Sequence, residues 1–375
     1  MRNLTFSDRV KNVFSSLNTD YESMNNLMQD LALGREIYDA ENDRVISKAE
    51  ANAKILDFSH KVLGISDVND AKQVRRALRD NGREWLDIIE DTVDMKITSG
   101  LQESDWFNEL VDSKGIGYHD RQDFYIPDDA VLSVAKAGTS HHDHILQRLS
   151  GGQTVSIPTE LYVVKVGADI NRYVTGQVDW NRLVDAISEA FTKEIQTEIY
   201  AEVTNAATKL PVTGPEYIGT GALAAGTKAQ FDAIIDNVSA ANNGAEVVIL
   251  GTKSGLSKIS ALADVDWGAN AQKDSVMNSG NIGIYEGTRL VTIPNRFVGK
   301  KPTGAKVFNP NVLMILPVIG EEGKFVKFVD EGDTQIIESL ERGDYISDLQ
   351  TYEVQRRFGV GTVIARQFGK WTITP

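Results

Sequence analysis

Apolar residues recur every three or four positions along several stretches of the chain, a spacing that predicts amphipathic helices. The most regular stretch follows Asp179, a residue type suited to capping a helix N-terminus. Its apolar positions are Trp180, Leu183, Val184, Ile187, Phe191, Ile195, Ile199 and Val203. The pattern predicts one helix of about 28 residues, which corresponds to a length of about 42 Å. Because only one stripe is apolar, we expect this helix to lie across a sheet or core.

Residues 1–118 also favour helices, although charged sequence separates the apolar stripes. The stripes comprise Met24, Leu27, Met28 and Leu31, and then Val74, Leu78, Trp85, Ile88, Ile89 and Val93. Between them, residues 39–54 contain few large apolar side chains. Amphipathic helices in proteins are stabilised mainly by the core against which they pack. We therefore expect this segment to bury little of itself and to form a helical arm or a set of loosely packed helices.

From Asp123 onward the pattern changes to short β-rich stretches. Residues 144–149 and 153–157 flank the turn sequence Ser150-Gly151-Gly152, which predicts a β-hairpin. After the long helix, a Gly/Pro/Ala-rich stretch precedes a second helix that begins near Thr227. A strand over 247–250, a short helix after Gly251 and several C-terminal strands follow. The presence of both helices and strands, mixed along the chain, predicts an α+β fold.

Composition narrows the classes of function that the chain can have. The 375 residues are 41% hydrophobic and 25% charged, which is enough to bury a sizeable core and corresponds to roughly two or three domains. The net charge of −14 argues against a dedicated nucleic-acid binder, because such proteins need a basic face. The absence of cysteine excludes disulfides, thiol catalysis and cysteine-ligated metals.

Membrane and secretory segments are not expected either. The apolar run 312–318 is far shorter than the ~20 residues needed to cross a bilayer. No apolar core follows Arg2, so residues 1–8 do not have the pattern of a secretory signal. We expect the chain to be made in a bacterial-type cytoplasm.

Two nucleotide-binding motifs are matched only in part. Residues 149–153 spell the signature motif of ATP-binding-cassette ATPases, which opens a helix facing the nucleotide. Here a strand pattern follows the motif instead. The sequence from Gly251 to Gly255 lacks the five-residue glycine spacing and the Lys-Ser or Lys-Thr of a P-loop. A hairpin turn is therefore the favoured interpretation of residues 149–153, and we expect no ATPase activity.

Histidines at 141, 142 and 144 are the one cluster that suggests a metal. His142 and His144 would share one side of an extended strand, so they are candidate ligands. A third ligand is not evident, and a solvated polar loop is favoured over a metal site. No Gly-x-Ser-x-Gly motif occurs. We expect no catalytic residue, no cofactor and no required metal. The alternative is a metal-dependent hydrolase that uses His142 and His144. Metal analysis of the purified protein would distinguish the two.

The order of the predicted elements resembles that of tailed-bacteriophage major capsid proteins, the Hong Kong 97-type fold. The resemblance covers residues 119–375: an extended hairpin loop, a long spine helix, a mixed domain and terminal strands. Residues 283–294 are similar to the stretch in which such proteins join two short strands by a small-residue turn before a proline. The resemblance implies an N-terminal helical arm at 1–118 and an extended loop at 119–178. It further implies a spine helix with a peripheral segment at 179–226, an axial domain at 227–293, and axial and peripheral strands at 294–375.

What the resemblance implies for function is a structural protein of the virion. Many copies would assemble as hexamers and pentamers into an icosahedral head in the host cytoplasm, with a portal and scaffold or decoration proteins as further partners. Packaged double-stranded DNA would be enclosed without specific binding, and no membrane would be involved. An encapsulin-like nanocompartment shell resembles the same fold and is the second alternative, which neighbouring genes would distinguish.

Two groups of residues acquire roles from the resemblance. The subunit-interface candidates on the hairpin are Leu149, Gly151, Gly152, Val155 and Ile157, with the apolar ones burying against an adjacent subunit. The spine-helix core candidates are Trp180, Leu183, Ile187, Phe191 and Ile195.

Overall fold

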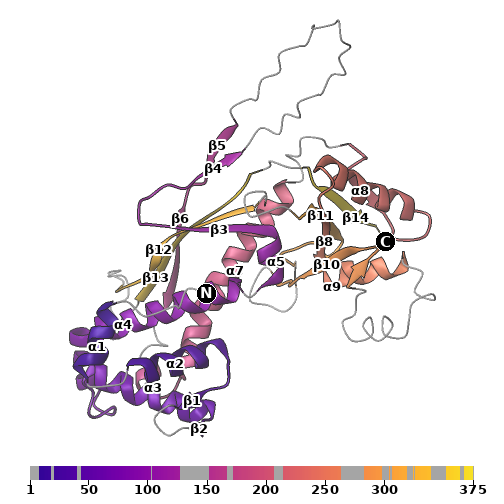
Figure 1. Ribbon diagram of the computed structural model, residues 1–375. Coiled ribbons are helices and arrows are strands. Elements are labelled where there is room, and N and C mark those ends of the chain that lie inside the picture. The colour runs from indigo at the N-terminus through magenta and orange to yellow at the C-terminus, as the bar shows by residue number, and fades with distance from the viewer. Residues whose placement is uncertain are drawn as a thin grey trace, which may run out of the picture. The chain divides into compact units, whose positions relative to one another are not determined.

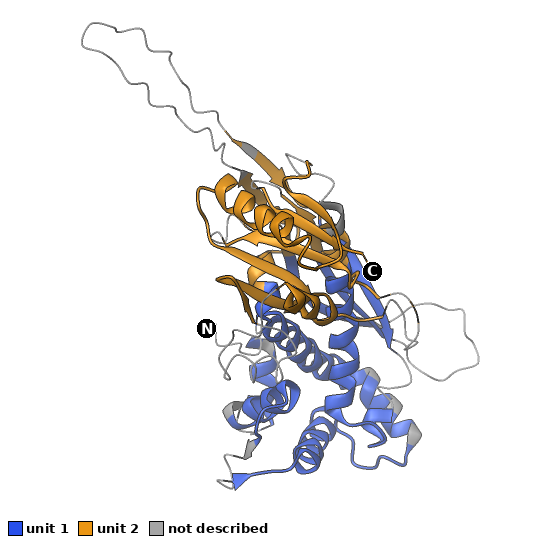
Figure 2. Ribbon diagram, turned by 90° about the vertical axis from the view of Figure 1, so that its right-hand side faces the viewer, with its two compact units in different colours: residues 1–107, 159–197, 330–358 blue, residues 108–158, 198–329, 359–375 orange. Residues whose placement is uncertain are grey.

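The computed structural model divides the chain into two compact units (Figure 2). It describes residues 8–17, 21–39, 44–102, 104–126, 152–166, 172–206, 214–262, 283–297, 304, 306–318, 324, 326–338, 352–363 and 367–374. Unit 1 comprises residues 1–107, 159–197 and 330–358, and unit 2 comprises residues 108–158, 198–329 and 359–375. Each unit is therefore assembled from segments that are distant in the sequence.

Helices and strands are mixed along the chain (Figure 1), so the predicted α+β class is confirmed. The helices are α1 (Asp8–Ser16), α2 (Tyr21–Leu33), α3 (Lys48–Leu63), α4 (Ala71–Gln102), α5 (Asp105–Leu110), α7 (Trp180–Ala206), α8 (Lys228–Ala241), α9 (Lys253–Leu256) and the 3-10 helix η1 (Ser257–Ala261). The strands are β1 (Tyr38–Asp39), β2 (Arg44–Val45), β3 (Val111–Ile116), β4 (Asp123–Ile126), β5 (Gln153–Ser156), β6 (Glu160–Val166), β7 (Ile218–Gly221), β8 (Val247–Thr252), β9 (Ile284–Tyr285), β10 (Thr288–Ile293), β11 (Val312–Pro317), β12 (Val326–Glu338), β13 (Tyr352–Thr362) and β14 (Gly369–Ile373).

The N-terminal helices form a packed core within unit 1, so the expectation of an arm that buries little of itself is wrong. Phe14 of α1 stacks on Phe58 of α3 with ring centroids 4.7 Å apart. Trp85 of α4 packs on Tyr173 at 5.5 Å and on Trp180, the first residue of α7, at 6.5 Å. The charged stretches between the apolar stripes give no local sign that Trp85, Tyr173 and Trp180 meet in the fold.

Local signals in the sequence determine where α3 begins and ends. The Ser47 side chain accepts a hydrogen bond from the Glu50 backbone N–H, and the Glu50 carboxylate accepts one from the Ser47 backbone N–H. This reciprocal pair is a capping box, which satisfies two donors that the helix itself leaves unpaired. At the other end Gly64 has a φ of 73°, the left-handed conformation that ends many helices.

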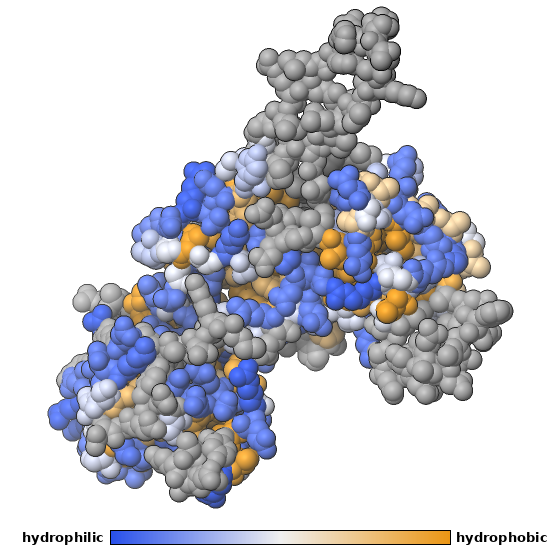
Figure 3. Space-filling view, in the orientation of Figure 1, coloured by the Kyte–Doolittle hydropathy of each residue, from blue (hydrophilic) through white to orange (hydrophobic). Residues whose placement is uncertain are grey.

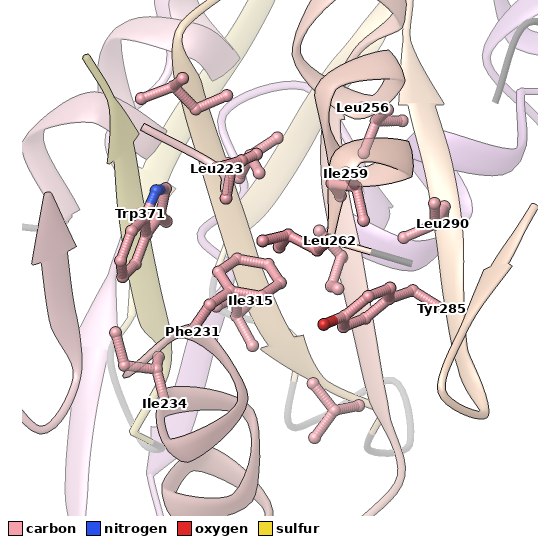
Figure 4. Packing of buried hydrophobic residues seen from close by; sticks show 14 of the residues in the cluster. Leu223, Phe231, Ile234, Leu256, Ile259, Leu262, Tyr285, Leu290, Ile315 and Trp371 are labelled. Atoms are coloured by element: carbon pink, nitrogen blue, oxygen red, sulfur yellow. The ribbon is translucent and has the colours of Figure 1, made fainter. Parts of the chain in front are cut away.

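Unit 2 contains a six-stranded sheet with the order β7-β14-β11-β8-β10-β9. Strand β8 reads Val-Val-Ile-Leu-Gly-Thr and is buried along its whole length, because it lies between β11 and β10 within the sheet. On one side of the sheet Phe231 and Ile234 of α8 pack against Trp371 of β14 and Ile315 of β11 (Figure 4). The Phe231 ring meets the Trp371 ring edge-on, with centroids 5.5 Å apart. This apolar cluster is the core of unit 2.

The turn between β9 and β10 has the backbone conformation that its sequence predicts. Glu286 has a φ of 45° and Gly287 a φ of 84°. Positive φ at both central residues is typical of the two-residue turns that match the twist of a hairpin. The Glu-Gly pair thus joins two short strands, as expected from the pattern at 283–294.

A second sheet has the order β3-β12-β13-β6. Strand β6 pairs with β13 in antiparallel register, with Val164 opposite Val354 and Tyr162 opposite Arg356. A separate two-stranded ribbon is formed by β4 and β5, with Phe124 opposite Val155. The predicted pairing of residues 144–149 with 153–157 is therefore corrected: the partner of residues 153–156 is β4, which lies before the loop rather than inside it.

Glycines in β13 allow the backbone after β5 to approach this strand closely. A Cβ atom added to Gly359 would lie 2.3 Å from the Pro158 carbonyl oxygen, a distance that real side chains do not adopt. We expect Gly359→Ala to lower the free energy of unfolding by about 1–3 kcal/mol, because one of two backbone segments must move. Urea unfolding measures this loss. Gly100→Ala is the control, because space around Gly100 is open and the exposed helical site should favour alanine; equal effects of the two substitutions would contradict the close approach.

Candidate assembly interface

The predicted spine helix corresponds to α7, which runs for 27 residues from Trp180 to Ala206. Its first turn follows Asp179, whose carbonyl oxygen accepts a hydrogen bond from the Leu183 backbone N–H at 3.2 Å. The side chains at the five predicted core positions are each no more than 2% exposed: Trp180, Leu183, Ile187, Phe191 and Ile195. The apolar stripe is thus covered by the chain itself.

The ribbon of β4 and β5 presents two chemically different faces. Tyr125 lies opposite Thr154, and both side chains are exposed, with Tyr125 62% exposed. Phe124 lies opposite Val155 on the other face, where Phe124 is buried and Val155 is half-buried. Because successive side chains of a strand point to opposite faces, one face is free for a partner and the other anchors the ribbon.

The anchoring face belongs to a small apolar cluster within unit 2. Its buried members are Phe124, Ile157, Val329 and Val363, with Ile116 and Val155 packed at its margin. Ile157 was expected to bury against a neighbouring subunit, but the chain's own residues cover it. The reason is the pairing of β5 with β4, which directs Val155 and Ile157 towards the side of Phe124.

A buried ion pair lies beside this anchor. Lys327 Nζ donates to Asp112 Oδ2 at 2.8 Å, and both side chains are only 3% exposed. The same Nζ lies 5.3 Å from the centroid of the Phe124 ring, and Lys114 Nζ lies 5.6 Å from it. Cations this close to an aromatic face are attracted to it. Lysines of two strands, Lys114 of β3 and Lys327 of β12, therefore contact the Phe124 ring, and these contacts stabilise the base of the ribbon.

Several predicted site residues fall outside the part of the chain that the structure describes. Leu149 and Gly151 of the interface set are among them, as are the metal candidates His142 and His144. Gly152 is described and is half-buried, with a φ of 23°. Among the described residues there is no group of three or more His, Asp or Glu side chains placed to hold a metal ion.

The two nucleotide-like motifs have no nucleotide-binding geometry within the described residues. Gln153 begins strand β5 rather than a helix. In the turn after β8, Thr252 caps the four-residue helix α9 by accepting a hydrogen bond from the Gly255 N–H at 3.2 Å. A Cβ atom on Gly255 would lie 2.7 Å from the Pro310 carbonyl oxygen. The turn is thus packed against the chain and leaves no space for a phosphate.

The surface is predominantly hydrophilic over the face shown in Figure 3, which fits the acidic composition. None of the helices in the described ranges is long and apolar enough to span a bilayer. Large apolar side chains that are exposed on unit 2 include Tyr118, Tyr125, Ile284 and Val318. Single exposed apolar residues are common, so the argument for an interface rests on the ribbon rather than on their number.

Sequence reasoning missed one polar cluster, centred on Arg356 in unit 1. Its guanidinium is 3% exposed and pairs with Asp94 of α4 and with Asp330 of β12. The signal was present, because Arg356 lies between Val354 and Phe358 in a strand whose alternate residues are buried. A period of two would have placed Arg356 inside with them.

Comparison with known proteins identifies the class. The chain matches a family model of phage-derived capsid proteins, and the match extends over residues 23–372. The chain therefore belongs to the family described as "SPbeta prophage-derived putative capsid protein YonB". The predictions that it is a structural capsid protein and a component of a virus particle are confirmed.

Three solved structures align with most of the chain at low sequence identity. Microbacterium phage Oxtober96 is 13% identical, with a TM-score of 0.46, covering 72% of this chain and 91% of that chain. The capsid of cyanophage P-SCSP1u is 13% identical, with a TM-score of 0.45, covering 72% and 88%. A virus-like particle from Pyrococcus furiosus is 12% identical, with a TM-score of 0.41, covering 75% and 98%. No curated protein matches the chain. The family assignment rests on the family model.

Proposed function

We propose that this chain is the major capsid protein of a tailed phage or prophage and that its copies assemble into a closed icosahedral head around double-stranded DNA. The observation that carries the proposal is the match to a capsid family over residues 23–372. A closed shell needs interfaces that repeat by symmetry, so hexamers and pentamers of one chain are the expected building units. A portal, a scaffold and decoration proteins are further proposed partners, and the host cytoplasm is the proposed place of assembly.

Features of the chain support a Hong Kong 97-type arrangement. The length and the buried apolar stripe of α7 support a role as the spine helix, and the pairing of β4 with β5 supports an extended loop. The six-stranded sheet and α8 support an axial domain. In this proposal the ribbon reaches an adjacent subunit, and Tyr125 and Thr154 are the residues that contact it.

The metal-dependent hydrolase is the least favoured of the alternatives, since capsid membership supplies a structural role. An encapsulin-like shell is also less favoured, because the family is described as prophage-derived. Negative-stain electron microscopy of the expressed full-length chain is the test. Regular closed particles support the proposal; a uniform monomer under all salt and protein concentrations would contradict it.

Tyr125→Asp tests the ribbon as an interface. The Tyr125 side chain is 62% exposed in the single chain, so an aspartate there should leave folding unchanged. If the residue is buried between copies, the new charge loses its hydration at every repeated contact. We expect the yield of sedimenting shells to fall at least about tenfold, which corresponds to about 1.4 kcal/mol.

The matched control is Val45→Asp, which places the same charge on an apolar residue of β2 that is 56% exposed. Circular dichroism should show that both variants fold. Shells from Tyr125→Asp at the wild-type yield would contradict the proposed role of the ribbon without affecting the assignment as a capsid protein.

A further inference from the structure

One face of α4 contacts β12 and β13 within unit 1 through acidic side chains. Asp94 Oδ2 accepts a hydrogen bond from the Thr334 backbone N–H at 2.9 Å, and its other oxygen accepts from the Thr334 hydroxyl and from Arg356 Nη1. One turn earlier, Glu90 accepts a hydrogen bond from the Ile336 backbone N–H. Two carboxylates four residues apart on the helix thus bind two backbone amides two residues apart on the strand.

Positive charge at this contact is supplied by Arg356. Its Nε and Nη2 donate to the two carboxylate oxygens of Asp330, with Nε 3.2 Å from Oδ1. Its Nη1 also donates to the Thr334 hydroxyl at 3.0 Å. The guanidinium therefore makes four hydrogen bonds, three to β12 and one to Asp94. Arg356 thus pairs with the carboxylates of Asp94 and Asp330, whereas the charges that act on Glu90 are those of neighbouring carboxylates.

Further negative charges face the same contact from both elements. On α4 these are Asp87 and Asp91, whose charges raise the pKa of Glu90, and on β12 Asp333 raises the pKa values of Asp94 and Asp330. With every carboxylate ionised, negative charge exceeds positive charge at a half-buried site. Like charges at such a site repel, and burial adds a cost to each ionised form.

We propose that this contact is a proton-dependent latch: α4 is held on β12 and β13 while Glu90 carries a proton, and it loosens when Glu90 ionises beside the carboxylate of Asp94. The proposal goes beyond assembly, since it concerns a conformational equilibrium inside one chain. The consequence is that α4 and the paired strands separate more readily above neutral pH than below it, while the aromatic core around Trp85 stays intact.

Burial brings the pKa of Glu90 into the pH range in which the latch is proposed to open, and brings the pKa of Asp94 to just below that range. Burial raises the pKa of Glu90 to about 7, against the opposing hydrogen bond from Ile336. Burial likewise raises the pKa of Asp94 to about 6, although Arg356 and Thr334 act in the opposite direction. Groups whose pKa is higher in the closed state than in the open state stabilise the closed state at low pH, and that stability is lost as pH rises through the closed-state value.

Hydrogen exchange of the full chain, corrected for the intrinsic pH dependence of exchange, measures the opening. For Glu90 alone, a pKa of about 7 when closed and 4.5 when open raises the opening constant about tenfold between pH 6 and pH 8. Asp94, with a pKa of about 6 when closed and 3.8 when open, adds about a further twofold, so we expect a rise of about twentyfold in peptides covering β12 and the second half of α4. In Glu90→Gln, whose amide oxygen still accepts from Ile336, the rise should shrink to the about twofold that Asp94 supplies.

Glu84→Gln is the matched control, because Glu84 is an exposed residue of the same helix and its change should leave the about twentyfold rise intact. A flat wild-type profile between pH 6 and pH 8, or an unchanged profile in Glu90→Gln, would overturn the latch. Should Glu90→Gln fail to fold, infrared spectra of the wild type decide: a protonated carboxyl band that disappears between pH 6 and pH 8 is required. None of these outcomes depends on whether particles form, so a failed latch and a failed capsid function give different results.

Discussion

Replacing Phe191 with alanine is expected to lower the free energy of unfolding by about 3–5 kcal/mol. Phe191 is 1% exposed and lies in the middle of the buried stripe of α7. The change removes a large apolar side chain from a covered site, so the loss combines the transfer of apolar surface with a cavity that neighbouring side chains fill only in part.

Urea unfolding of the unassembled chain, followed by circular dichroism, measures this loss. Glu194→Ala is the control, since Glu194 is an exposed residue of the same helix and should change stability by no more than about 0.5 kcal/mol. A loss below about 1 kcal/mol for Phe191→Ala would show that the apolar face of α7 is assigned to the wrong side.

Arg356→Met is expected to cost about as much, roughly 3–5 kcal/mol near neutral pH. The substitution keeps an unbranched apolar stem but removes the guanidinium, which leaves the buried carboxylates of Asp94 and Asp330 without their cation. Protonation relieves the unpaired charge, because burial already raises the pKa values of both groups. The loss should therefore be larger at pH 8 than at pH 5.

The comparison for Arg356→Met is Arg121→Met, which breaks an exposed pair. Arg121 Nε donates to Asp123 Oδ1 at 2.8 Å, yet the arginine side chain is 71% exposed. Exposed pairs of this kind contribute at most about 1 kcal/mol to the free energy of unfolding. Similar losses in both variants, or a loss from Arg356→Met that does not change with pH, would contradict the electrostatic account of the cluster.

Features set by local sequence were predictable. The stripe from Trp180 to Val203 predicted α7 to within a few residues, because an amphipathic pattern of that length has one geometric solution. The pattern at 283–294 similarly predicted the β9–β10 hairpin, in which Glu286 and Gly287 supply the two left-handed residues. In both cases the information lies within a single element.

Features set by contacts between distant segments were not predictable. The ribbon was predicted at β5, but its partner β4 ends at Ile126, far earlier in the sequence, and no local pattern specifies that register. The N-terminal helices were expected to lack a core, although Trp85 meets Tyr173 and Trp180 across about 90 positions of sequence. Of the candidate interface residues, Ile157 is covered by its own chain for the same reason.

Residues that pack as closely as Ile157 and Gly361 should not vary independently among natural relatives. A Cβ atom on Gly361 would lie 3.1 Å from Ile157 Cδ1, so a larger residue at 361 is accommodated by a shift of the Ile157 side chain or by a smaller residue at 157. Among homologous sequences the two positions are expected to covary in volume, with alanine at 361 accompanied by valine or alanine at 157. A combinatorial library at these two sites would show the same compensation as recovered solubility, and it would identify the sequence space in which the base of the ribbon can be redesigned.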